Sequence, residues 1–570
     1  MTIASRQITL VLTAIVLVCG IGCDLDGKVT LDFPINLGDQ VPTIVGDTGG
    51  GDDGGGGITL PPIGGGGGGD TDPFDGTWIV SYADNLAVGG ALQSYAVRAI
   101  LAQDGSAITG SGQMLRFFQT GAIANDFPAF NLTISGTVSG DSATLTIASA
   151  INNSFVNNPV WNVRVVGNRL IGVYSEKDTF SGNVQRLGYS VWHRSTTSDF
   201  DAEFVSAYMD AGVNVDGVQT LTNELASRTG RVTLAQGGAA ITGGGTLIEQ
   251  ASGPLTSTTD FAVTTGQLQG LLGGITFGNL VDQVVGPVAG NIDWIMISNG
   301  NVMVGAYGEF NATDGLVRLG HGTWRRSSPV QPSDINATWV TSFEDTHADG
   351  VDNEFNYLAT VSLTVGAGGV VTGSAQVLDE TDVNPVLTPF TVENGNILGN
   401  LVVFDLVGPG GERFAWDCRL ADGVLVGSYQ HTDTVGDFIS HGKAEWRTGS
   451  STGLVGTWVA SYFDTFTGSA VENRTSQLAR VEITSATTGG NLNGAGTVRL
   501  ASETGPRFFT VTGNVTTTLI QMIWSGGDLF GDTEWNLRKV GNFLFGTYTN
   551  FDSGGVIEFQ GFAVFERSVI

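Results

Sequence analysis

The segment Asp75-Gly76-Thr77-Trp78-Ile79-Val80-Ser81-Tyr82-Ala83-Asp84 returns near the end of the chain as Val455-Gly456-Thr457-Trp458-Val459-Ala460-Ser461-Tyr462-Phe463-Asp464. Weaker copies begin around Phe204 and Trp339. The four aromatic residues at the Trp78 position lie roughly 120 to 135 residues apart, far above the 20 to 50 residues of a solenoid or propeller unit. The sequence therefore predicts four repeats, each as large as a domain.

Two further blocks repeat in the same register. Each repeat contains a Trp followed by a Gly-x-Tyr triplet, namely Trp161 with Gly172 and Tyr174, Trp294 with Gly305 and Tyr307, Trp416 with Gly427 and Tyr429, and Trp535 with Gly546 and Tyr548. Each repeat closes on a glycine-led segment, at 188–195, 320–327, 442–448 and 561–568. We therefore place the four repeats at residues 73–196, 197–330, 331–450 and 451–570.

Each repeat contains eight stretches of strand character separated by Gly, Asn or Asp turns. In the first repeat they lie near 76–84, 92–103, 106–114, 128–138, 142–148, 159–166, 169–176 and 184–194. No segment has the length and the 3.6-residue period of a helix. Eight sequential antiparallel strands either close into a barrel or split into a sandwich, and closure removes the exposed edges. We predict an all-β chain with four tandem eight-stranded antiparallel up-and-down β-barrels.

The charge and the rare residues exclude several functions. The chain has 25 Lys and Arg against 55 Asp and Glu, a net charge of −30, which repels phosphate backbones and excludes nucleic acid as a partner. Three cysteines and five histidines leave few ligands for a metal site or a disulfide framework. No histidine shares a repeat position with a nearby base and nucleophile. We therefore assign no catalytic residue, cofactor or metal, and expect a protein that is not an enzyme.

The N-terminal segment has the pattern of an export signal. Arg6 precedes the apolar run 8–18, which is too short to span a bilayer but suits a signal peptide over residues 1–22. The following Gly20-Ile21-Gly22-Cys23-Asp24 resembles a bacterial lipobox, although Gly20 stands where that motif usually has Leu. The resemblance implies that Cys23 carries a lipid that attaches the exported protein to a membrane of the cell envelope. The alternative is cleavage near Gly22 and release.

Residues 23–72 join this segment to the first repeat. They contain glycine runs at 49–57 and 64–69 and show no alternating pattern. Such a composition buries too little apolar surface to offset the entropy of ordering the backbone. We expect a disordered, flexible Gly-rich linker.

Four segments of the repeat resemble the calycin superfamily, which contains lipocalin-like and avidin-like barrels. They are Gly76-Thr77-Trp78, Ile108-Thr109-Gly110-Ser111-Gly112, Gly172-x-Tyr174 and Arg194. In lipocalins the first-strand Trp closes one end of the barrel, and an Arg of the last strand lies across it. The implied closing pairs are Trp78 with Arg194, Phe204 with Arg326, and Trp458 with Arg567. In the third repeat Arg447 stands one position early, and the biotin-binding residues of avidins have no match.

The inward face of each barrel is a candidate ligand site. Strand alternation places Trp78, Val80 and Tyr82 on one face, and the middle of this face stays small in all four repeats, for example at Gly172 and Gly546. This layer is either a cavity for a small apolar or planar ligand or space filled by Trp161 and its equivalents. For the cavity, the candidate ligand-binding residues are Trp78, Tyr82, Tyr174, Trp339, Tyr429, Trp458 and Tyr548.

Acidic residues recur at the predicted rim of each barrel, at Asp84, Asp210, Asp345 and Asp464. They either accept hydrogen bonds from a polar ligand, bind calcium, or cap turns. Calcium is most plausible in the third repeat, where acidic residues cluster at Glu344, Asp345, Asp349, Asp352 and Glu354.

The expected function is non-enzymatic binding of a small molecule by an exported lipoprotein. The alternative is a structural or adhesive surface role through the outer faces of the barrels. A single membrane-spanning barrel is disfavoured because the chain ends Arg567-Ser568-Val569-Ile570 without a terminal aromatic residue. The sequence names no protein partner.

Overall fold

The computed structural model describes residues 72–568 apart from short gaps. The gaps are 88–91, 119–129, 150–157, 179–180, 196, 198, 216–217, 220–224, 251–255, 270–271, 284–285, 289, 313–315, 346–354, 381–384, 450–452, 468–473, 488, 518, 527–528, 530 and 553. The predicted signal peptide, Cys23 and nearly all of the predicted linker lie outside the described residues. The four repeats belong to one compact unit.

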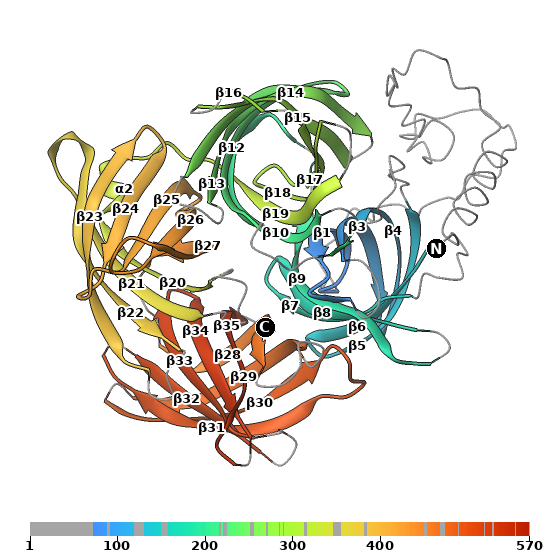
Figure 1. Ribbon diagram of the computed structural model, residues 1–570. Helices are drawn as coiled ribbons and strands as arrows, with labels where there is room; N and C mark the ends of the chain where they lie inside the picture. The colour runs from blue at the N-terminus through green and yellow to red at the C-terminus, as the bar shows by residue number, and fades with distance from the viewer. Residues whose placement is uncertain are drawn as a thin grey trace, which may run out of the picture. The chain divides into compact units, whose positions relative to one another are not determined.

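The first repeat is a closed antiparallel barrel whose eight long strands follow the order of the chain (Figure 1), as predicted. Strands β1 and β9 pair to close it, and a two-residue strand, β2, also pairs with β9. The strands are β1 (Gly76–Ala83), β2 (Leu86–Ala87), β3 (Gln93–Asp104), β4 (Ala107–Phe118), β5 (Phe130–Ser139), β6 (Ser142–Ser149), β7 (Val160–Val166), β8 (Arg169–Lys177) and β9 (Val184–Ser195).

The second repeat closes in the same way, through pairing of its first and last long strands. It adds two short strands, β11 and β16, to the eight long ones. The strands are β10 (Ala202–Val215), β11 (Val218–Gln219), β12 (Ser227–Gly237), β13 (Ala240–Gln250), β14 (Ser257–Gln269), β15 (Leu272–Asp282), β16 (Gly286–Pro287), β17 (Asn291–Ser298), β18 (Val302–Phe310) and β19 (Leu316–Arg326).

The third and fourth repeats are closed eight-stranded barrels, and their described residues contain no such short strands. The third consists of β20 (Ala337–Glu344), β21 (Asn356–Val365), β22 (Val370–Asp379), β23 (Leu387–Leu398), β24 (Leu401–Val407), β25 (Arg413–Ala421), β26 (Val424–Thr432) and β27 (Phe438–Arg447). The fourth consists of β28 (Gly456–Thr467), β29 (Ser476–Ala486), β30 (Gly490–Leu500), β31 (Arg507–Val515), β32 (Ile520–Ser525), β33 (Thr533–Val540), β34 (Phe543–Phe551) and β35 (Ile557–Ser568).

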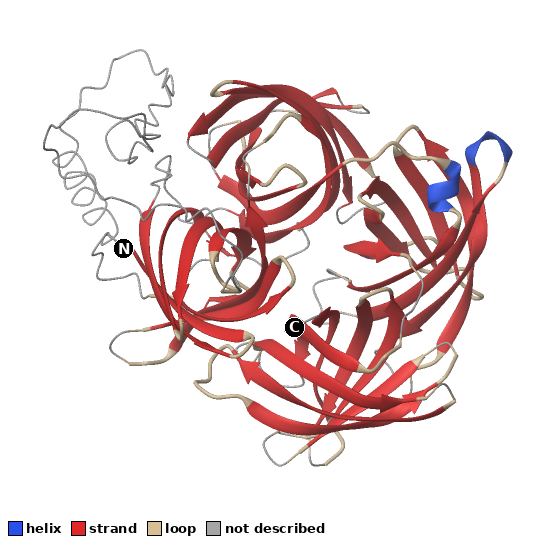
Figure 2. Ribbon diagram, turned by 180° about the vertical axis from the view of Figure 1, so that it is seen from behind, coloured by secondary structure: helices blue, strands red, loops and turns tan. Residues whose placement is uncertain are grey.

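Among the described residues, helical structure is confined to two short segments in the third repeat (Figure 2). They are α2 (Pro332–Ile335), just before β20, and the 3-10 turn η2 (Ala367–Gly369) between β21 and β22. Among the described residues, no helix has the length and apolar character needed to cross a bilayer.

Each barrel is filled by aromatic rings from its inward face. In the first barrel Trp161 meets Trp192 edge to face, with ring centroids 5.3 Å apart, and the centroid of the Tyr174 ring lies 4.8 Å from that of Trp161. The same arrangement recurs in the other barrels, as Trp294 with Trp324 and Tyr307, Trp416 with Trp446 and Tyr429, and Trp535 with Phe565 and Tyr548. These offset and edge-to-face contacts suit the ring quadrupoles.

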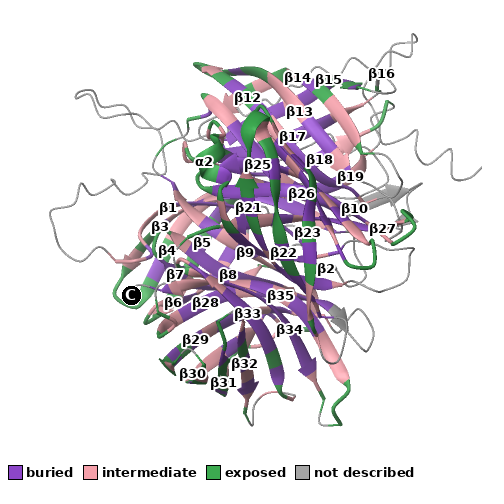
Figure 3. Ribbon diagram, turned by 90° about the vertical axis from the view of Figure 1, so that its left-hand side faces the viewer, coloured by how far each residue is buried: buried purple, intermediate pink, exposed green. Residues whose placement is uncertain are grey.

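The outward face of the first strand is also buried, because neighbouring barrels pack against one another. Along β5 buried and exposed residues alternate, but β1 is buried on both faces from Trp78 onward (Figure 3). Ile79 packs on Ile295 and Ile297 of the second barrel. Its equivalents Val205, Val340 and Val459 pack on the third, fourth and first barrels respectively. Every barrel therefore contacts the next, and the fourth contacts the first.

Candidate functional site

The predicted ligand-binding residues all lie inside the barrel cores. Each has 2% or less of its side chain exposed and belongs to an apolar cluster of its own barrel. They are Trp78, Tyr82, Tyr174, Trp339, Tyr429, Trp458 and Tyr548. Of these seven residues, Tyr548 also lines a pocket, which lies at one end of the fourth barrel.

The glycines at mid-depth lie against side chains of the neighbouring strand. A Cβ added at Gly172 would lie 2.6 Å from Val163 Cγ1, and one added at Gly546 would overlap Leu537 Cδ2. At Gly305 it would lie 3.2 Å from the ring of Trp294. The glycines are thus close contacts between strands, and neighbouring side chains occupy the space that a mid-depth cavity would need. Cys418 is buried in the core of the third barrel, at the position that Val163 and Leu537 hold in the first and fourth barrels.

The predicted closing pairs are placed differently in the four barrels. Arg194 lies 4.6 Å above the ring of Trp78, and Arg567 lies 5.7 Å from that of Trp458. In the second barrel Arg326 is opposite Phe204 in register and is exposed. In the third barrel the early Arg447 points outward, and its guanidinium lies over Phe543 of the fourth barrel instead of Trp339.

The recurring acidic residues are buried and bind a tyrosine inside the same barrel. Tyr174, Tyr307, Tyr429 and Tyr548 donate hydrogen bonds from their hydroxyls to Asp84, Asp210, Asp345 and Asp464 respectively. The sequence placed the tyrosines on the inward face and the aspartates at the rim, but it did not predict that they form hydrogen bonds with one another. Within the described ranges, no cluster of three or more His, Cys, Asp or Glu side chains is arranged to hold a metal ion. Asp349, Asp352 and Glu354 lie outside the described residues.

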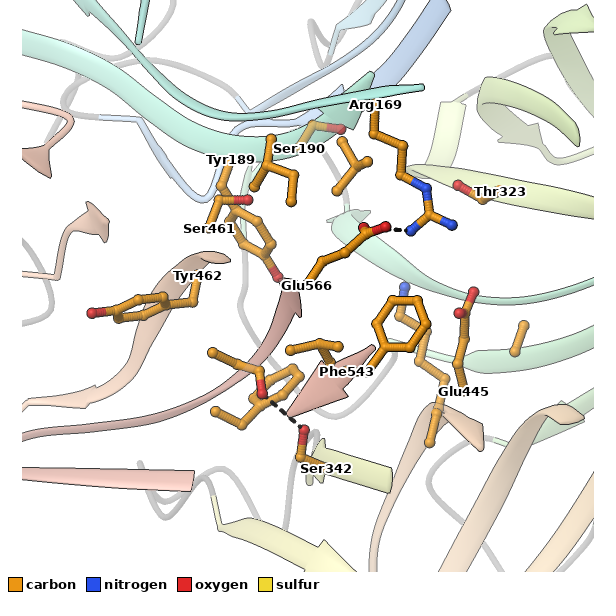
Figure 4. Close-up of a pocket in the computed structure, with 18 of the residues that line it drawn as sticks. Arg169, Tyr189, Ser190, Thr323, Ser342, Glu445, Ser461, Tyr462, Phe543 and Glu566 are labelled. Carbon is orange, nitrogen blue, oxygen red and sulfur yellow. Dashed lines mark hydrogen bonds and ion pairs between the residues drawn. The ribbon is translucent and has the colours of Figure 1, made fainter. Parts of the chain in front are cut away.

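A pocket of about 360 Å³ lies where the four barrels meet (Figure 4). Its wall includes three outward residues from the last strand of every barrel, because alternation sends the residues between them into the cores. These twelve are Tyr189, Val191 and His193; His321, Thr323 and Arg325; Lys443, Glu445 and Arg447; and Phe562, Val564 and Glu566. The repeat pattern of the sequence did not predict this pocket.

Two ion pairs that join different barrels lie in the wall of this pocket. Arg169 of the first barrel lies 2.8 Å from Glu566 of the fourth, and Arg325 of the second lies 2.9 Å from Glu445 of the third. Burial alone would raise the pKa of Glu445, but Arg325 and also Arg447, 3.1 Å away, lower it to about 2. Glu445 is therefore a carboxylate shared by two guanidinium groups.

The pocket wall carries more positive than negative charge. Arg169, Arg325, Lys443 and Arg447 face two carboxylates, Glu445 and Glu566. Burial lowers the pKa of the two wall histidines to about 3, so His193 and His321 are neutral at physiological pH. In the described part of the chain the Lys443 ammonium has no hydrogen bond and no ion pair within 4 Å, and Glu344 and Glu445 act on it only from farther away.

Aromatic side chains also line this pocket. Phe543, Phe545 and Phe562 of the fourth barrel and Tyr189 of the first line it. The guanidinium carbon of Arg447 lies 4.2 Å from the centre of the Phe543 ring, and that of Arg169 lies 5.9 Å from it. Cationic and apolar surface therefore adjoin in one pocket.

One polar atom beside this pocket lacks a partner. Ser81 and Ser342 donate hydrogen bonds to the carbonyls of Gly322 and Ala563 in the next barrel, at 3.2 and 3.3 Å. Their equivalent in the fourth barrel, Ser461, also lines the pocket, and its buried hydroxyl has no hydrogen-bond partner among the described residues. It leaves one hydroxyl available to a ligand.

Comparisons with known proteins add little to this geometry. No protein-family model matches the chain, and no curated protein matches it. One solved structure with a match is a protein of unknown function of the DUF3598 family from Nostoc punctiforme PCC 73102. It is 11% identical, the match covers 44% of this chain and 99% of that one, and the TM-score is 0.17. Membership of the calycin superfamily thus remains a prediction from the sequence.

Proposed function

We propose that this protein is a non-enzymatic binding protein of the bacterial cell envelope, exported and anchored through a lipid on Cys23. Its site is the pocket among the four barrels, and its ligand is a small organic anion with a planar or apolar body. The Lys443 ammonium, which faces the pocket without an ion pair, carries this proposal.

The charge of the whole chain makes this pocket distinctive. A net charge of −30 repels anions from most of the surface. A pocket with four cationic side chains against two carboxylates is a local exception. Because a partly buried cation without a partner is costly, an anion that reaches Lys443 reduces this cost.

The aromatic part of the wall accounts for the apolar half of the ligand. Ligand pockets are typically apolar with a few convergent polar groups. Here Phe543, Phe562 and Tyr189 supply the apolar surface, and Lys443 and the Ser461 hydroxyl supply the polar groups. This assigns the predicted small, planar ligand to the outer faces of the barrels rather than to their interiors.

A pair of fluorescent probes tests the proposal on the full chain. We expect 8-anilinonaphthalene-1-sulfonate, a planar anion, to bind the wild type, and Lys443→Met to weaken it about tenfold, since one charge-assisted contact is lost. The matched control Lys177→Met removes the same charge from the end of β8, outside the pocket wall, and should change nothing. The uncharged analogue N-phenyl-1-naphthylamine should not distinguish Lys443→Met from the wild type. Equal sulfonate affinity in both lysine variants would contradict the proposal.

Native mass spectrometry of the protein from its own host separates binding from the structural alternative. A retained acidic molecule, lost in Lys443→Met, supports the binding function. Two results together would favour the structural or adhesive role: the protein retains no small molecule, and Lys443→Met binds the probe as well as the wild type does.

A further inference from the structure

A second pocket, of about 240 Å³, lies at one end of the fourth barrel. Strands β28, β29, β34 and β35 line it with Asp464, Gln477, Asn550 and Phe559. Val498, Leu500 and Leu529 add apolar surface. It is separate from the pocket among the barrels, with which it shares no lining residue.

The corresponding end of the first and second barrels is filled by arginine. Arg186 donates a hydrogen bond to Asp84 at 2.6 Å. In the second barrel Arg228 donates to Asp210 at 2.7 Å, and Arg318 lies 3.6 Å from the other oxygen of the same carboxylate. In these two barrels a guanidinium neutralises the buried carboxylate that the tyrosine hydroxyl also binds.

The fourth barrel keeps the carboxylate but has no cation at these arginine positions, and Arg507, which also lines the pocket, is paired with Glu503. Phe559 stands at the position of Arg186 and Arg318, two residues before the glycine that opens the closing block, and Gln477 stands at the position of Arg228. Asp464 accepts hydrogen bonds from Tyr548, from Gln477 at 2.7 Å and from the Thr475 backbone at 3.0 Å. Among the described residues it has no ion pair within 4 Å. Burial raises the pKa of Asp464 to about 7, and Arg474 opposes this only slightly.

A second acceptor in the same pocket lacks a donor. The side chain of Asn550 is 9% exposed, and its amide nitrogen donates to Thr533 Oγ1 at 2.9 Å. Its Oδ1 is buried and has no hydrogen-bond partner in the described part of the chain. At this position the first and second barrels have Glu176 and Glu309, which lie 3.8 and 2.8 Å from their arginines.

We propose that the end of the fourth barrel binds a protonated primary amine with an apolar body. Its ammonium takes the place of the guanidinium groups of the first two barrels, donating to Asp464 and to Asn550 Oδ1. Its apolar body lies against Phe559, Leu500 and Leu529. A charge-assisted donor fits both observations, because a carboxylate without a cation and an unpaired amide oxygen are each costly when buried.

Calorimetric titration of the full chain with 2-phenylethylamine at about pH 8 tests this site, because the amine is then still protonated. We expect 2-phenylethylamine to bind, and the neutral 2-phenylethanol to bind about tenfold more weakly or not at all. Equal affinity for the amine and the alcohol, or absence of amine binding at millimolar concentration, would overturn the proposal without any variant.

Phe559→Arg is the decisive substitution, since it copies the first two barrels. The new guanidinium should occupy the ammonium position and weaken amine binding about tenfold or more, while the melting temperature is kept. Asp464→Asn should have the same effect on binding, and Asp84→Asn in the first barrel should have none. Lys443→Met should also leave amine binding unchanged, because it lies in the other pocket. Unchanged amine affinity in a folded Phe559→Arg protein would overturn the assignment.

Discussion

The guanidinium of Arg325, on the last strand of the second barrel, donates hydrogen bonds to both carboxylate oxygens of Glu445, on the last strand of the third barrel, at 2.9 and 3.0 Å. The two residues are 120 positions apart in the chain. Arg447 donates to the same carboxylate at 3.1 Å. One carboxylate thus holds two cations of the wall in place and limits the positive charge that the pocket offers to an anion.

Glu445→Gln should strengthen the binding of anilinonaphthalene sulfonate by about tenfold, because Arg325 and Arg447 lose their shared counter-ion and become available to the probe. The free energy of unfolding should fall by only about 1 kcal/mol, since the pair is partly solvated. Fluorescence titration and urea unfolding measure the two effects. Glu482→Gln, which removes an exposed carboxylate of the fourth barrel, is the matched control. Weaker probe binding in Glu445→Gln would contradict this account of the pocket.

Glu380 should make the stability of the protein fall as the pH rises. This third-barrel carboxyl is buried against the fourth barrel, where it accepts hydrogen bonds from Thr547 at 2.8 Å and from Asn536 at 3.2 Å. Burial raises its pKa from the ordinary 4.5 to about 7. The folded chain therefore holds this proton up to about pH 7 and the unfolded chain only to about 4.5, a difference worth about 3 kcal/mol.

Glu380→Gln should remove this pH dependence, because the amide stays neutral in both states. Relative to the wild type, the variant should gain stability between about pH 5 and pH 8, as measured by urea unfolding at both values. Glu393→Gln, at an exposed position of β23, should keep the wild-type slope. If the stability difference between Glu380→Gln and the wild type is the same at both pH values, the carboxyl is not protonated in the folded chain.

Gly546→Ala should destabilise the fourth barrel by about 1 to 3 kcal/mol, because the added methyl would overlap Leu537 Cδ2 and lie 2.8 Å from the carbonyl oxygen of Asn536. Leu537→Ala should relieve only the first of these contacts. In thermal unfolding the double variant should therefore lose less stability than the two single variants together. Strict additivity would mean that open space, and not Leu537, faces Gly546.

Cys23→Ser should abolish fatty-acid labelling and move the protein from the membrane fraction to a soluble or uncleaved form. The expectation follows from the lipobox-like Gly20-Ile21-Gly22-Cys23. Cys418→Ser is the control, because that thiol is buried in the third barrel and cannot be acylated without unfolding. Unchanged labelling in Cys23→Ser would rule out the anchor.

The local pattern of the sequence was sufficient for the barrels. Period-2 alternation and hairpin-length turns predicted eight strands per repeat, and in the first repeat the predicted ends lie within a few residues of the observed ones, for example 169–176 against Arg169–Lys177. Repetition of the Trp and Gly-x-Tyr blocks placed these rings on one inward face. Both features depend on residues that are near in sequence or repeat within one barrel.

The candidate sites are formed by residues of different strands and repeats, and the pattern within one strand does not show which of these residues meet. Lys443, Glu445 and Arg447 look like solvent-facing residues of one strand. Only the packing of the four barrels against one another encloses them. The partner of Glu445 comes from another repeat. At Asp464 the four-fold repeat did carry a usable signal, since Phe559 replaces an arginine, but it had no meaning until the structure placed that position beside the carboxylate.

Sequence alone thus determined the number of repeats, their strand order and the aromatic residues of the inward face, because side-chain alternation is set by neighbours along the chain. The tertiary structure decided which outward side chains meet. Contacts such as Arg325 with Glu445 join strands of different barrels. Their geometry depends on how the four closed sheets pack, and the periodicity of the sequence within a strand does not show this packing.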